Sequence, residues 1–550
     1  MKWLSNNKNW LLLVAFLFLN WLILRPVLLP DIFFSAHDST WIIRLQQFDK
    51  AVSLGQFPPR LAPDMAYGYG YPLFKYYAPL FTFLSWLIFK IIGDYALSVT
   101  LTIFLSNITG SLGMFYLGRK LWGFWGGVVA SVSFIFLPFR ALDIYVRAAL
   151  SELLAVNLFP FWCYFFICLV KDKLTKQTIV GFILFSLSLL LAHNLYLIIL
   201  ACCLPILAIY FFLAASSLKR KLLAVFGLSG LVLLLAAWYW LPALTGLADV
   251  NTLGQAAKTR FDQHFLYLKQ LWDWSWGFGG SAPGLADGMS FKIGKIQLIL
   301  AVFGLWFGLT RKKHRSAVIT FLILALGGVF LTLSWSSFLW EKLPFLAIVQ
   351  FPWRFLGLVV PIVALVSGGA VALVVKAGPK SLPKKATVLF SLLAIFLIIY
   401  FNIKYFTPQN IIKNARAHFL DRDKIYQSAH LAAEYYPVNV SVWPEEKPDW
   451  PLNFSGNQTA QIIAETPFKI IFRLNNPGEI TVNRFYFSGW QLRYQEEEIN
   501  IGYEERTGRI LFQADQQGEY HLSFEVTTWE KVAYIITVLG FIALIIVFLF

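Results

Sequence analysis

Long apolar runs dominate this chain and restrict its fold more than any other feature. About twelve of them have the length needed to cross a membrane: residues 10–29, 97–117, 124–141, 153–170, 177–192, 195–213, 222–243, 294–310, 316–334, 354–375, 385–403 and 530–550. Because 58% of the 550 residues are hydrophobic and only 14% are charged, lipid must solvate much of the chain. We therefore expect a polytopic integral membrane protein with about twelve transmembrane helices.

The distribution of basic residues decides the expected orientation. The net charge is +16, and Lys and Arg gather in short clusters between apolar runs, as in cytoplasmic loops that follow the positive-inside rule. One further apolar run, 79–92, is short and carries Lys90. If 79–92 does not cross, every basic cluster falls on the cytoplasmic side, so we predict a re-entrant or interfacial helix there. No nucleic-acid partner is expected, because no basic patch lies on a soluble domain.

This topology divides the chain into three parts. Residues 1–403 form an all-α transmembrane domain, whose first external loop covers 30–96. Residues 404–529 form an exported domain, and 530–550 form a C-terminal transmembrane helix. Within 404–529, runs such as FKIIFRL and GRILFQA alternate polar and apolar residues between Asn-Pro-Gly and Gln-Gly turns. That alternation is typical of strands, so we predict a small extracytoplasmic β-sandwich-like domain.

His37 and Asp38 follow the first span directly and begin the polar part of the first external loop. Apolar residues then recur every three or four positions: Trp41, Leu45, Phe48 and Val52. This spacing predicts an amphipathic helix that lies in the membrane interface and ends at Gly55. Asp38 is expected at its N-cap, where the helix dipole favours a carboxylate. Asp38 is then either an ordinary cap or, with His37 beside it, a catalytic group.

The rest of this loop mixes basic and aromatic residues. Arg60 and Lys75 are candidate ligands of a donor phosphate or lipid. Tyr67, Tyr69 and Tyr71 alternate with glycines in the string YGYGY, and their flat rings could stack on a sugar. The alternative for the tyrosines is an interfacial aromatic belt.

Charged residues also mark the second external loop. Asp143, Arg147 and Glu152 lie at the mouths of two spans, where a charge must be paired or hydrated. Arg147 and Ser151 are expected one helical turn apart, with Glu152 at the edge of the same face. The Arg147 guanidinium either binds a phosphate bidentately or pairs with Asp143 or Glu152 to hold the helix ends.

Two further candidates lie at the external ends of other spans. His193 follows an apolar run and is either a packing residue or a ligand of the acceptor sugar. Arg354 stands beside Trp353 in the string FPWRF and is either a phosphate ligand or a residue that extends to the interface. The chain has no nucleotide-binding loop, no serine-hydrolase elbow and no zinc-protease motif.

These residues carry a family resemblance. The strings HDS, FPPR, GYGYPLF, YVRAALSE and FPWRF resemble the bacterial membrane proteins named "6-pyruvoyl-tetrahydropterin synthase related". An acidic residue in a long first external loop, a charged second loop and a C-terminal external domain resemble the GT-C superfamily of membrane glycosyltransferases. The string FYFSGWQL at 485–492 is similar to the end domain of other membrane glycosyltransferases.

The resemblance implies an enzyme of the bacterial inner membrane whose active site faces the extracytoplasmic side. It would transfer a sugar from a polyprenyl-phosphate donor to a glycan, lipid or protein acceptor. By position Asp38 matches the first-loop acidic residue, which acts as general base or orients the acceptor hydroxyl, and Asp143 stands near the second-loop acidic residue. No D-x-D pair is present there. The positive charge at the leaving phosphate then comes either from a divalent cation or from Arg147 with Arg354.

Two other functions fit the same pattern. A transporter or flippase of lipid-linked glycans would need a continuous polar path between its spans. A non-catalytic membrane scaffold would act through its exported β domain, which would bind a glycan or a protein.

Overall fold

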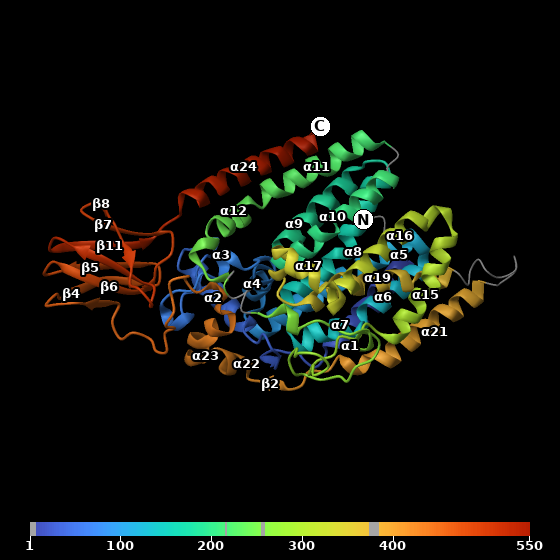
Figure 1. Cartoon of the computed structure of the whole chain (residues 1–550), viewed down its shortest axis with the longest axis horizontal. Coiled ribbons are helices and arrows are strands. Elements are labelled where there is room, and N and C mark those ends of the chain that lie inside the picture. Colours follow the sequence, from blue (N-terminus) through green and yellow to red (C-terminus); the bar gives the residue numbers. More distant parts are fainter. Residues whose placement is uncertain (1–6, 215–216, 253, 255–258, 373–383, 550) are drawn as a thin grey trace. The chain divides into compact units, whose positions relative to one another are not determined.

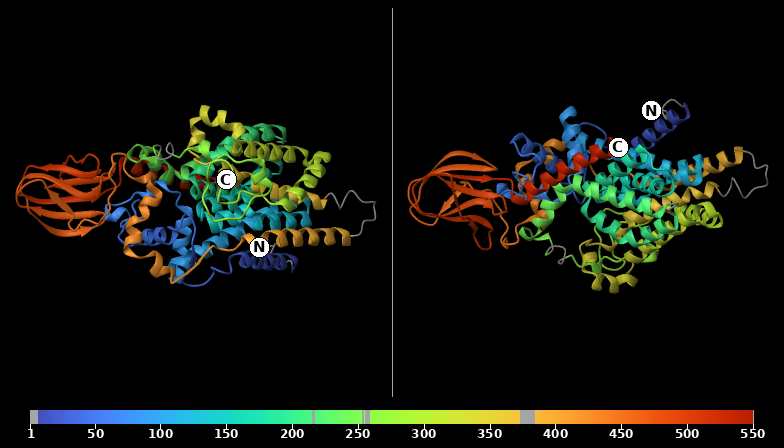
Figure 2. Two further views of the ribbon diagram at one scale, coloured as in Figure 1. Left: turned by 60° about the horizontal axis from the view of Figure 1, so that its bottom comes forward. Right: turned by 90° about the horizontal axis from the view of Figure 1, so that it is seen from above.

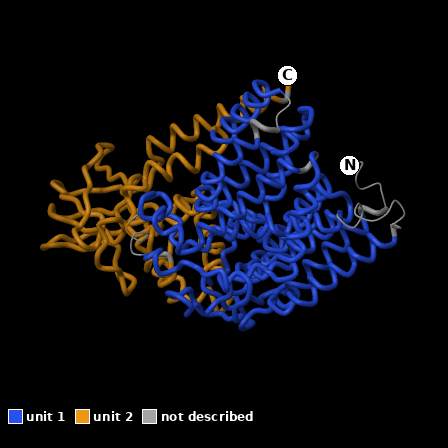
Figure 3. Tube along the Cα trace, turned by 45° about the vertical axis from the view of Figure 1, so that its right-hand side comes forward, with its two compact units in different colours: residues 1–39, 78–233, 259–415 blue, residues 40–77, 234–258, 416–550 orange. Residues whose placement is uncertain are grey.

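The computed structural model describes residues 7–214, 217–252, 254, 259–372 and 384–549, most of which are helical (Figure 1). The chain forms two compact units (Figure 3). Unit 1 is built from stretches within Met1–Ser39, Ala78–Leu233 and Thr259–Ala415, and unit 2 from stretches within Thr40–Tyr77, Leu234–Lys258 and Arg416–Phe550. The sequence predicts domains that are continuous in the chain, with boundaries after residues 403 and 529. Each compact unit instead combines three separate stretches of the chain.

Unit 1 is a helical bundle. Its longer helices are α1 (Asn7–Leu24), α4 (Leu80–Ile92), α5 (Tyr95–Trp122), α6 (Phe124–Ile135), α8 (Leu150–Lys171), α9 (Lys176–Ala192), α10 (Asn194–Ala214), most of α11 (Leu218–Leu235), α15 (Lys295–Thr310), α16 (Lys312–Thr332), α19 (Leu356–Ser367) and α21 (Lys384–Asn402). α19 lies at the centre, because the apolar stretch within Pro352–Ala372 is entirely buried. A Cβ added at Gly304 of α15 would lie 1.9 Å from the Val366 carbonyl oxygen, so only glycine allows this close approach to α19.

The described helices support a membrane protein but not the full number of spans. Six are long and apolar enough to cross a membrane: Tyr95–Trp122, Leu150–Lys171, Arg315–Thr332, Pro352–Ala372, Lys385–Tyr405 and Thr528–Val547. Two bent pairs, Phe124–Ile135 with Pro138–Val146 and Leu218–Leu235 with Ala237–Thr245, raise the number to 8 if each pair is one span. The remaining predicted spans coincide with shorter apolar helices: Trp10–Leu24, Lys176–Ala192, Asn194–Tyr210 and Lys295–Thr310. The count of about twelve is therefore not confirmed.

The ambiguous run at 79–92 forms α4, which has 13 residues. A helix of this length rises about 20 Å, whereas the hydrocarbon core is about 30 Å thick. α4 is therefore too short to cross a bilayer alone, and it ends at Gly93 in the left-handed conformation (φ 77°). Its re-entrant or interfacial placement remains a prediction.

Short elements complete unit 1. They are α7 (Pro138–Ala141), the π-helix η2 (Leu142–Val146), α14 (Leu268–Trp272), α17 (Ser337–Lys342), α18 (Pro344–Ala347), and the 3-10 helices η4 (Phe261–Gln263), η5 (Ser334–Ser336), η6 (Pro352–Phe355) and η7 (Ile403–Tyr405). β1 (Ile32–Phe34) pairs antiparallel with β2 (Ile411–Lys413), with Phe34 opposite Ile411. This pairing anchors the start of the first loop, since His37 and Asp38 follow β1 by only three and four residues.

Unit 2 contains the predicted β domain, with two sheets. Its strands are β3 (Leu452–Phe454), β4 (Ala460–Thr466), β5 (Lys469–Leu474), β6 (Gly478–Phe485), β7 (Trp490–Tyr494), β8 (Glu497–Ile499), β9 (Gly502–Tyr503), β10 (Arg509–Ala514) and β11 (Gly518–Phe524). One sheet has the order β3-β6-β10-β9 and the other β4-β5-β11-β7-β8. Figure 2 shows the strands of this domain, in orange to red, in two further views. Phe472 of β5 and Phe512 of β10 meet with ring centroids 6.3 Å apart, which joins the two sheets. A β-sheet region near the C-terminus is therefore confirmed, while its extracytoplasmic placement stays a prediction.

Helices of three separate stretches belong to unit 2. They are α2 (Trp41–Ser53), η1 (Ala66–Gly68), α3 (Leu73–Tyr76), α12 (Ala237–Thr245), η3 (Leu247–Asp249), α23 (Arg422–Gln427), η8 (Ser428–Tyr435) and α24 (Thr528–Leu549), while α22 (Ala415–Phe419) lies at the boundary between the units. α12 and α24 lie side by side (Figure 1). The backbone N–H of Trp238 on α12 donates to Thr537 Oγ1 on α24 across 2.9 Å, which fixes their register.

Candidate active site

Two backbone hydrogen bonds bring the first and second predicted external loops together inside unit 1. The N–H of His37 donates to the Val146 carbonyl across 2.9 Å, and the N–H of Asp38 donates to the Arg147 carbonyl across 3.0 Å. The His37 side chain is exposed, and its Nε2 lies 3.0 Å from the Phe278 carbonyl oxygen in the loop before α15. Asp38 is half-buried. These bonds hold His37 and Asp38 beside Arg147 of the second loop.

The backbone around Arg147 is irregular. α6 and the helical segment Pro138–Val146 meet at a bend of 41°, and the last turn before Arg147 is a π-helix. Ala148 has a φ of 48°, in the left-handed region that alanine rarely adopts. π-helical turns and strained residues often mark functional sites, because their cost must be offset elsewhere in the structure. α8 begins only at Leu150, so the expectation that Arg147 and Ser151 share one helical turn is wrong.

Arg147 bridges two carboxylates. Its Nη1 donates to Asp143 Oδ1, and its Nη2 donates to Glu152 Oε2 across 2.6 Å. The guanidinium also lies over the Trp353 ring, 4.4 Å from the centroid. Arg147 thus pairs with both acidic residues that the sequence offered as partners, and all three side chains are buried.

Several polar atoms of this cluster have no hydrogen-bond partner among the described residues. They are Asp143 Oδ2, Ser151 Oγ, Glu152 Oε1 and the indole nitrogen of Trp353. Buried polar atoms are almost always paired in folded proteins, and the exceptions gather where water, an ion or a ligand binds. Asp143 and Glu152 therefore each have one carboxylate oxygen that Arg147 does not bind.

Arg354 brings a second positive charge to the cluster from η6. Its Nη1 donates to the Val349 carbonyl across 2.8 Å and to Gln350 Oε1 across 2.9 Å, and its guanidinium lies 5.0 Å from the centre of the Phe351 ring. Arg354 interacts electrostatically with Glu152 and His193. The fold therefore brings Arg147, Arg354 and His193 into one neighbourhood, although they lie on distant segments.

His193 occupies the one-residue break between α9 and α10 and is half-buried. Its Nδ1 accepts a hydrogen bond from the Tyr196 backbone N–H at 3.1 Å, so the proton of the neutral ring must sit on Nε2. Desolvation lowers the pKa of His193 to about 4; Glu152 acts in the opposite direction, and Arg354 adds to the lowering. His193 is therefore a neutral donor through Nε2.

The described residues form no cluster of metal-ligating side chains at this site. Among the residues that the structure describes, no three His, Cys, Asp or Glu side chains are grouped closely enough to hold an ion. Asp143 and Glu152, which would be the natural oxygen ligands, instead share the Arg147 guanidinium. The candidate divalent cation thus remains a prediction without a structural site.

Arg60 has a different environment, wholly within unit 2. Its Nη1 pairs with Glu530 Oε2 at 2.9 Å and donates to the Glu525 carbonyl at 2.8 Å, and its guanidinium lies 4.5 Å from the centre of the Phe524 ring. Arg60 thereby joins the first loop to the start of α24. These contacts occupy Arg60 Nη1, and the assignment of Arg60 to phosphate binding stays a prediction.

Lys75 lies close to Arg60 in unit 2 and is buried, with 8% of its surface exposed. Burial lowers its pKa, while the negative charges of Glu530 and Asp249 act in the opposite direction. Within the described part of the chain its Nζ forms neither a hydrogen bond nor an ion pair; its nearest aromatic neighbour is the Tyr76 ring, at 5.5 Å.

The predicted sugar-stacking tyrosines are packed against other rings of unit 2. Tyr67 is 5.8 Å from Tyr426, Tyr69 is stacked at 5.3 Å on Phe485, and Tyr71 is 5.5 Å from Tyr436. Tyr67 and Tyr71 are buried, and Tyr69 is partly exposed. Protein rings therefore cover part of each tyrosine, and the assignment of these tyrosines to sugar binding stays a prediction.

The N-cap expected at Asp38 is also wrong. α2 begins at Trp41, and its N-cap is Thr40. The backbone N–H of Asp38 donates to the Arg147 carbonyl, so Asp38 lies before the first turn of α2. Ser39 and Thr40 connect Asp38 to that turn.

The sequence analysis missed Arg140, which is fully buried in unit 1. It donates to the carbonyls of Phe134 and Ile135 at 3.0 and 3.3 Å and to Asn107 Oδ1 and Asn157 Oδ1 at 2.6 and 2.9 Å. These bonds satisfy the last carbonyls of α6 at the break before α7. A charge inside an apolar run, just after Pro138, is the signal that could have identified it.

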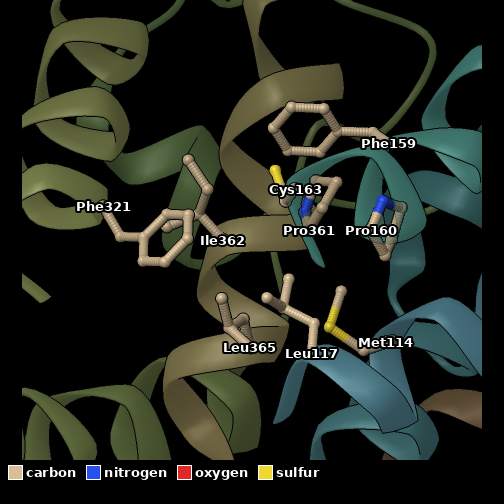
Figure 4. Close-up of a pocket in the computed structure, with 9 residues that line it drawn as sticks. All are labelled: Met114, Leu117, Phe159, Pro160, Cys163, Phe321, Pro361, Ile362 and Leu365. Atoms are coloured by element: carbon tan, nitrogen blue, oxygen red, sulfur yellow. The ribbon is translucent and has the colours of Figure 1, made fainter. Parts of the chain in front are cut away.

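Elsewhere in the bundle, apolar side chains of α5, α8, α16 and α19 line a narrow pocket (Figure 4). It is lined by Met114, Leu117, Phe159, Pro160, Cys163, Phe321, Pro361, Ile362 and Leu365. Pro160 lies inside α8, which carries Ser151 and Glu152 near its N-terminal end. Pro361 lies inside α19, which follows η6 with its Trp353 and Arg354.

One protein-family model matches a large part of the chain. The model of the 6-pyruvoyl-tetrahydropterin synthase related domain, a membrane protein, matches residues 74–408. No curated protein matches the sequence. The arabinofuranosyltransferase AftD from Mycobacteria is similar at 13% identity with a TM-score of 0.47, over 76% of this chain and 29% of AftD. ArnT from Cupriavidus metallidurans, solved with undecaprenyl phosphate, is similar at 13% identity with a TM-score of 0.39, over 78% of this chain and 75% of ArnT.

The matched residues include Asp143, Arg147, Glu152, His193 and Arg354, while His37 and Asp38 precede them. Because the match covers more than half of the chain, this protein belongs to the 6-pyruvoyl-tetrahydropterin synthase related family of membrane proteins.

Proposed function

We propose that this protein is a glycosyltransferase that moves a sugar from a polyprenyl-phosphate donor to an acceptor at the membrane surface. The observation that carries the proposal is the bonding of His37 and Asp38 to the Val146–Arg147 backbone, beside a buried cluster of two carboxylates and two guanidinium groups. Acid, base and cationic groups meet there around unpaired polar atoms. Group transfer from a phosphate needs these same kinds of groups.

In the proposed reaction Asp38 is the general base. Its carboxylate takes the proton of the acceptor hydroxyl, and the freed oxygen attacks the anomeric carbon of the sugar. The bond between that carbon and the phosphate oxygen breaks, and its electron pair leaves with the polyprenyl phosphate. Attack from the face opposite the phosphate inverts the anomeric centre.

Arg354 and Arg147 take different parts in this reaction. Two carboxylates already neutralise Arg147, so we assign it to holding Asp143 and Glu152 in place. Arg354 then supplies the positive charge that stabilises the leaving phosphate. The Nε2 proton of His193 is a further donor to a phosphate or sugar oxygen. His37, through its contact with the Phe278 carbonyl, fixes the loop that holds Asp38.

The positive-inside rule supports an active site on the extracytoplasmic face, and the family resemblance supports the bacterial inner membrane. On this topology the β domain of unit 2 lies on the same side as the loops that hold the cluster. We therefore assign the acceptor, a glycan, lipid or protein, to the aqueous side.

Assay of the purified full-length protein with polyprenyl-phosphate sugars tests this function. Transfer by the wild type, and a loss of at least about 100-fold in Asp38→Asn, would support it. Asp262→Asn, which changes an exposed carboxylate that pairs with Arg260, is the matched control. A panel of donors that the wild type leaves unchanged would reject the enzyme, and an active Asp38→Asn would reject Asp38 as the base.

One observation favours the flippase alternative. Buried polar side chains run between α1, α5 and α8: Asn20 donates to Ser111 at 3.1 Å, and Asn157 donates to Asn107 at 2.9 Å. A polar path through the bundle is what lipid-linked glycan transport requires. Movement of a fluorescent lipid-linked sugar across proteoliposomes, without any transfer product, would favour transport.

A further inference from the structure

The amine of Lys75 is buried in unit 2 without an ion pair, which is unusual for a lysine. Only 8% of the residue is exposed. A buried ammonium that lacks a partner is costly, so lysines in such places are paired, neutralised or ligand-bound. The neighbouring positive charge of Arg60 is already balanced by Glu530 at 2.9 Å. Within the part of unit 2 that the structure describes, Lys75 Nζ has the Tyr76 ring 5.5 Å away but neither a hydrogen bond nor an ion pair.

Asp249 supplies the matching negative charge. Its Oδ2 is buried and has no hydrogen-bond partner among the described residues. Both groups surround Gly246: a Cβ added there would lie 2.8 Å from Lys75 Nζ, and the Asp249 backbone N–H donates to the Gly246 carbonyl across 3.0 Å. Lys75 and Asp249 nevertheless form no ion pair within 4.0 Å. The site thus holds one positive and one negative group near Gly246, and neither has an ion-pair partner among the described residues.

This site lies where two lipid-facing helices end. α12 ends at Thr245, next to Gly246. α24 begins at Thr528, and Glu530 in its first turn binds Arg60. The Lys75 backbone N–H donates to the Arg60 carbonyl across 3.1 Å, which ties α3 to the same point. Large apolar side chains are exposed along both helices: Leu244, Trp529, Ile535 and Leu539. The ends of apolar helices lie at the level of lipid headgroups.

We propose that Lys75 and Asp249 bind the headgroup of an aminophospholipid, as in phosphatidylethanolamine. The lipid phosphate pairs with Lys75 Nζ, and the lipid ammonium pairs with the Asp249 carboxylate. Its acyl chains lie along α12 and α24. An anionic headgroup without an amine would satisfy Lys75 but leave Asp249 unpaired beside an added negative charge, so the paired charges favour the zwitterion.

This site is made by residues of unit 2 alone and is independent of the proposed transfer reaction. The test is lipid retention by the delipidated full-length protein in native mass spectrometry. The probes are phosphatidylethanolamine, phosphatidylglycerol and inorganic phosphate. We expect the wild type to bind phosphatidylethanolamine at least about tenfold more tightly than phosphatidylglycerol, since one charge-assisted bond is worth about 1.5–3 kcal/mol.

Lys75→Met should weaken both lipids, and Asp249→Asn should remove only the preference between them. Lys531→Met, which removes an exposed lysine of α24, should change neither. Lys75→Arg keeps the positive charge. Circular dichroism monitors folding and so separates loss of binding from loss of folding. Equal binding of both lipids by the wild type, unchanged binding in Lys75→Met, or full displacement of the lipid by inorganic phosphate would each overturn the proposal.

Discussion

The backbone N–H of Asp38 donates a hydrogen bond to the backbone carbonyl of Arg147 across 3.0 Å. More than one hundred residues of chain separate these two positions. A bond between main-chain groups does not depend on the side chains, so replacing Asp38 or Arg147 should leave this contact in place. Substitutions at either residue therefore report on chemistry and charge rather than on the meeting of the two loops.

Removing the charge of Arg147 should destabilise unit 1. Arg147→Met leaves Asp143 and Glu152 buried without their shared cation, which should cost about 3–5 kcal/mol in the free energy of unfolding. Thermal unfolding in detergent measures the loss. Arg260→Met, at an exposed pair, is the control and should cost under about 1 kcal/mol. Adding Asp143→Asn and Glu152→Gln to Arg147→Met should recover stability; no recovery would contradict the charge explanation.

His193 should act as a neutral donor. The glutamine side chain in His193→Gln can supply an N–H near the position of Nε2, so transfer should stay within about tenfold of wild type, while His193→Leu should lose more. If activity in His193→Gln fell as far as in His193→Leu, the donor role would be refuted.

The same residue predicts a dependence of stability on pH. The pKa of His193 in the folded protein is about 4, and its ordinary value is about 6.5. Between these values the unfolded chain binds a proton that the folded chain does not, so the free energy of unfolding falls as the pH falls from about 6.5 towards 4. Comparison of Tm over this range should show a smaller fall in His193→Gln than in wild type. Parallel curves would argue against the neutral buried state.

Arg140 should be needed for the break between α6 and α7. Arg140→Lys keeps the charge but cannot reach all four oxygens, and Arg140→Leu leaves the carbonyls of Phe134 and Ile135 unsatisfied. Since each lost bond to a charged group costs about 1.5–3 kcal/mol, Tm should fall in the order wild type, lysine, leucine. Arg311→Leu, at an exposed position, is the control. Equal stability of all three forms would show that Arg140 does not hold the break.

Labelling of introduced cysteines tests the topology. Ile91→Cys at the end of α4 should react with an impermeant reagent from outside the cell, and Lys173→Cys after α8 only once the membrane is opened. Both positions are exposed in the structure. The native cysteines lie in helices, and three of the four are buried, so the unmodified protein gives the background. Labelling of both positions from the same side would show that the assignment of α4 is wrong.

The membrane character and the β domain could be predicted because both depend on local patterns. Runs of apolar residues and polar–apolar alternation in FKIIFRL or GRILFQA need no knowledge of the fold. The number of spans was harder to predict, since the 41° bend after Ile135 and the 17 residues of α9 change how far each apolar run reaches. Pairing was harder still: Arg60 and Lys75 were candidate phosphate ligands, yet Arg60 binds Glu530, which is 470 positions later in the chain.

The sequence by itself determined that this chain enters a membrane, which segments are apolar, and which charged residues lie at their ends, because hydropathy and charge are properties of each residue. Only the tertiary structure decided which of those charges meet. It placed Arg147 between Asp143 and Glu152, separated Arg60 and Lys75 into unit 2, and packed Tyr67 and Tyr71 against protein rings. A charge takes its role from its partners, and residues distant in the chain become partners only through the packing of helices.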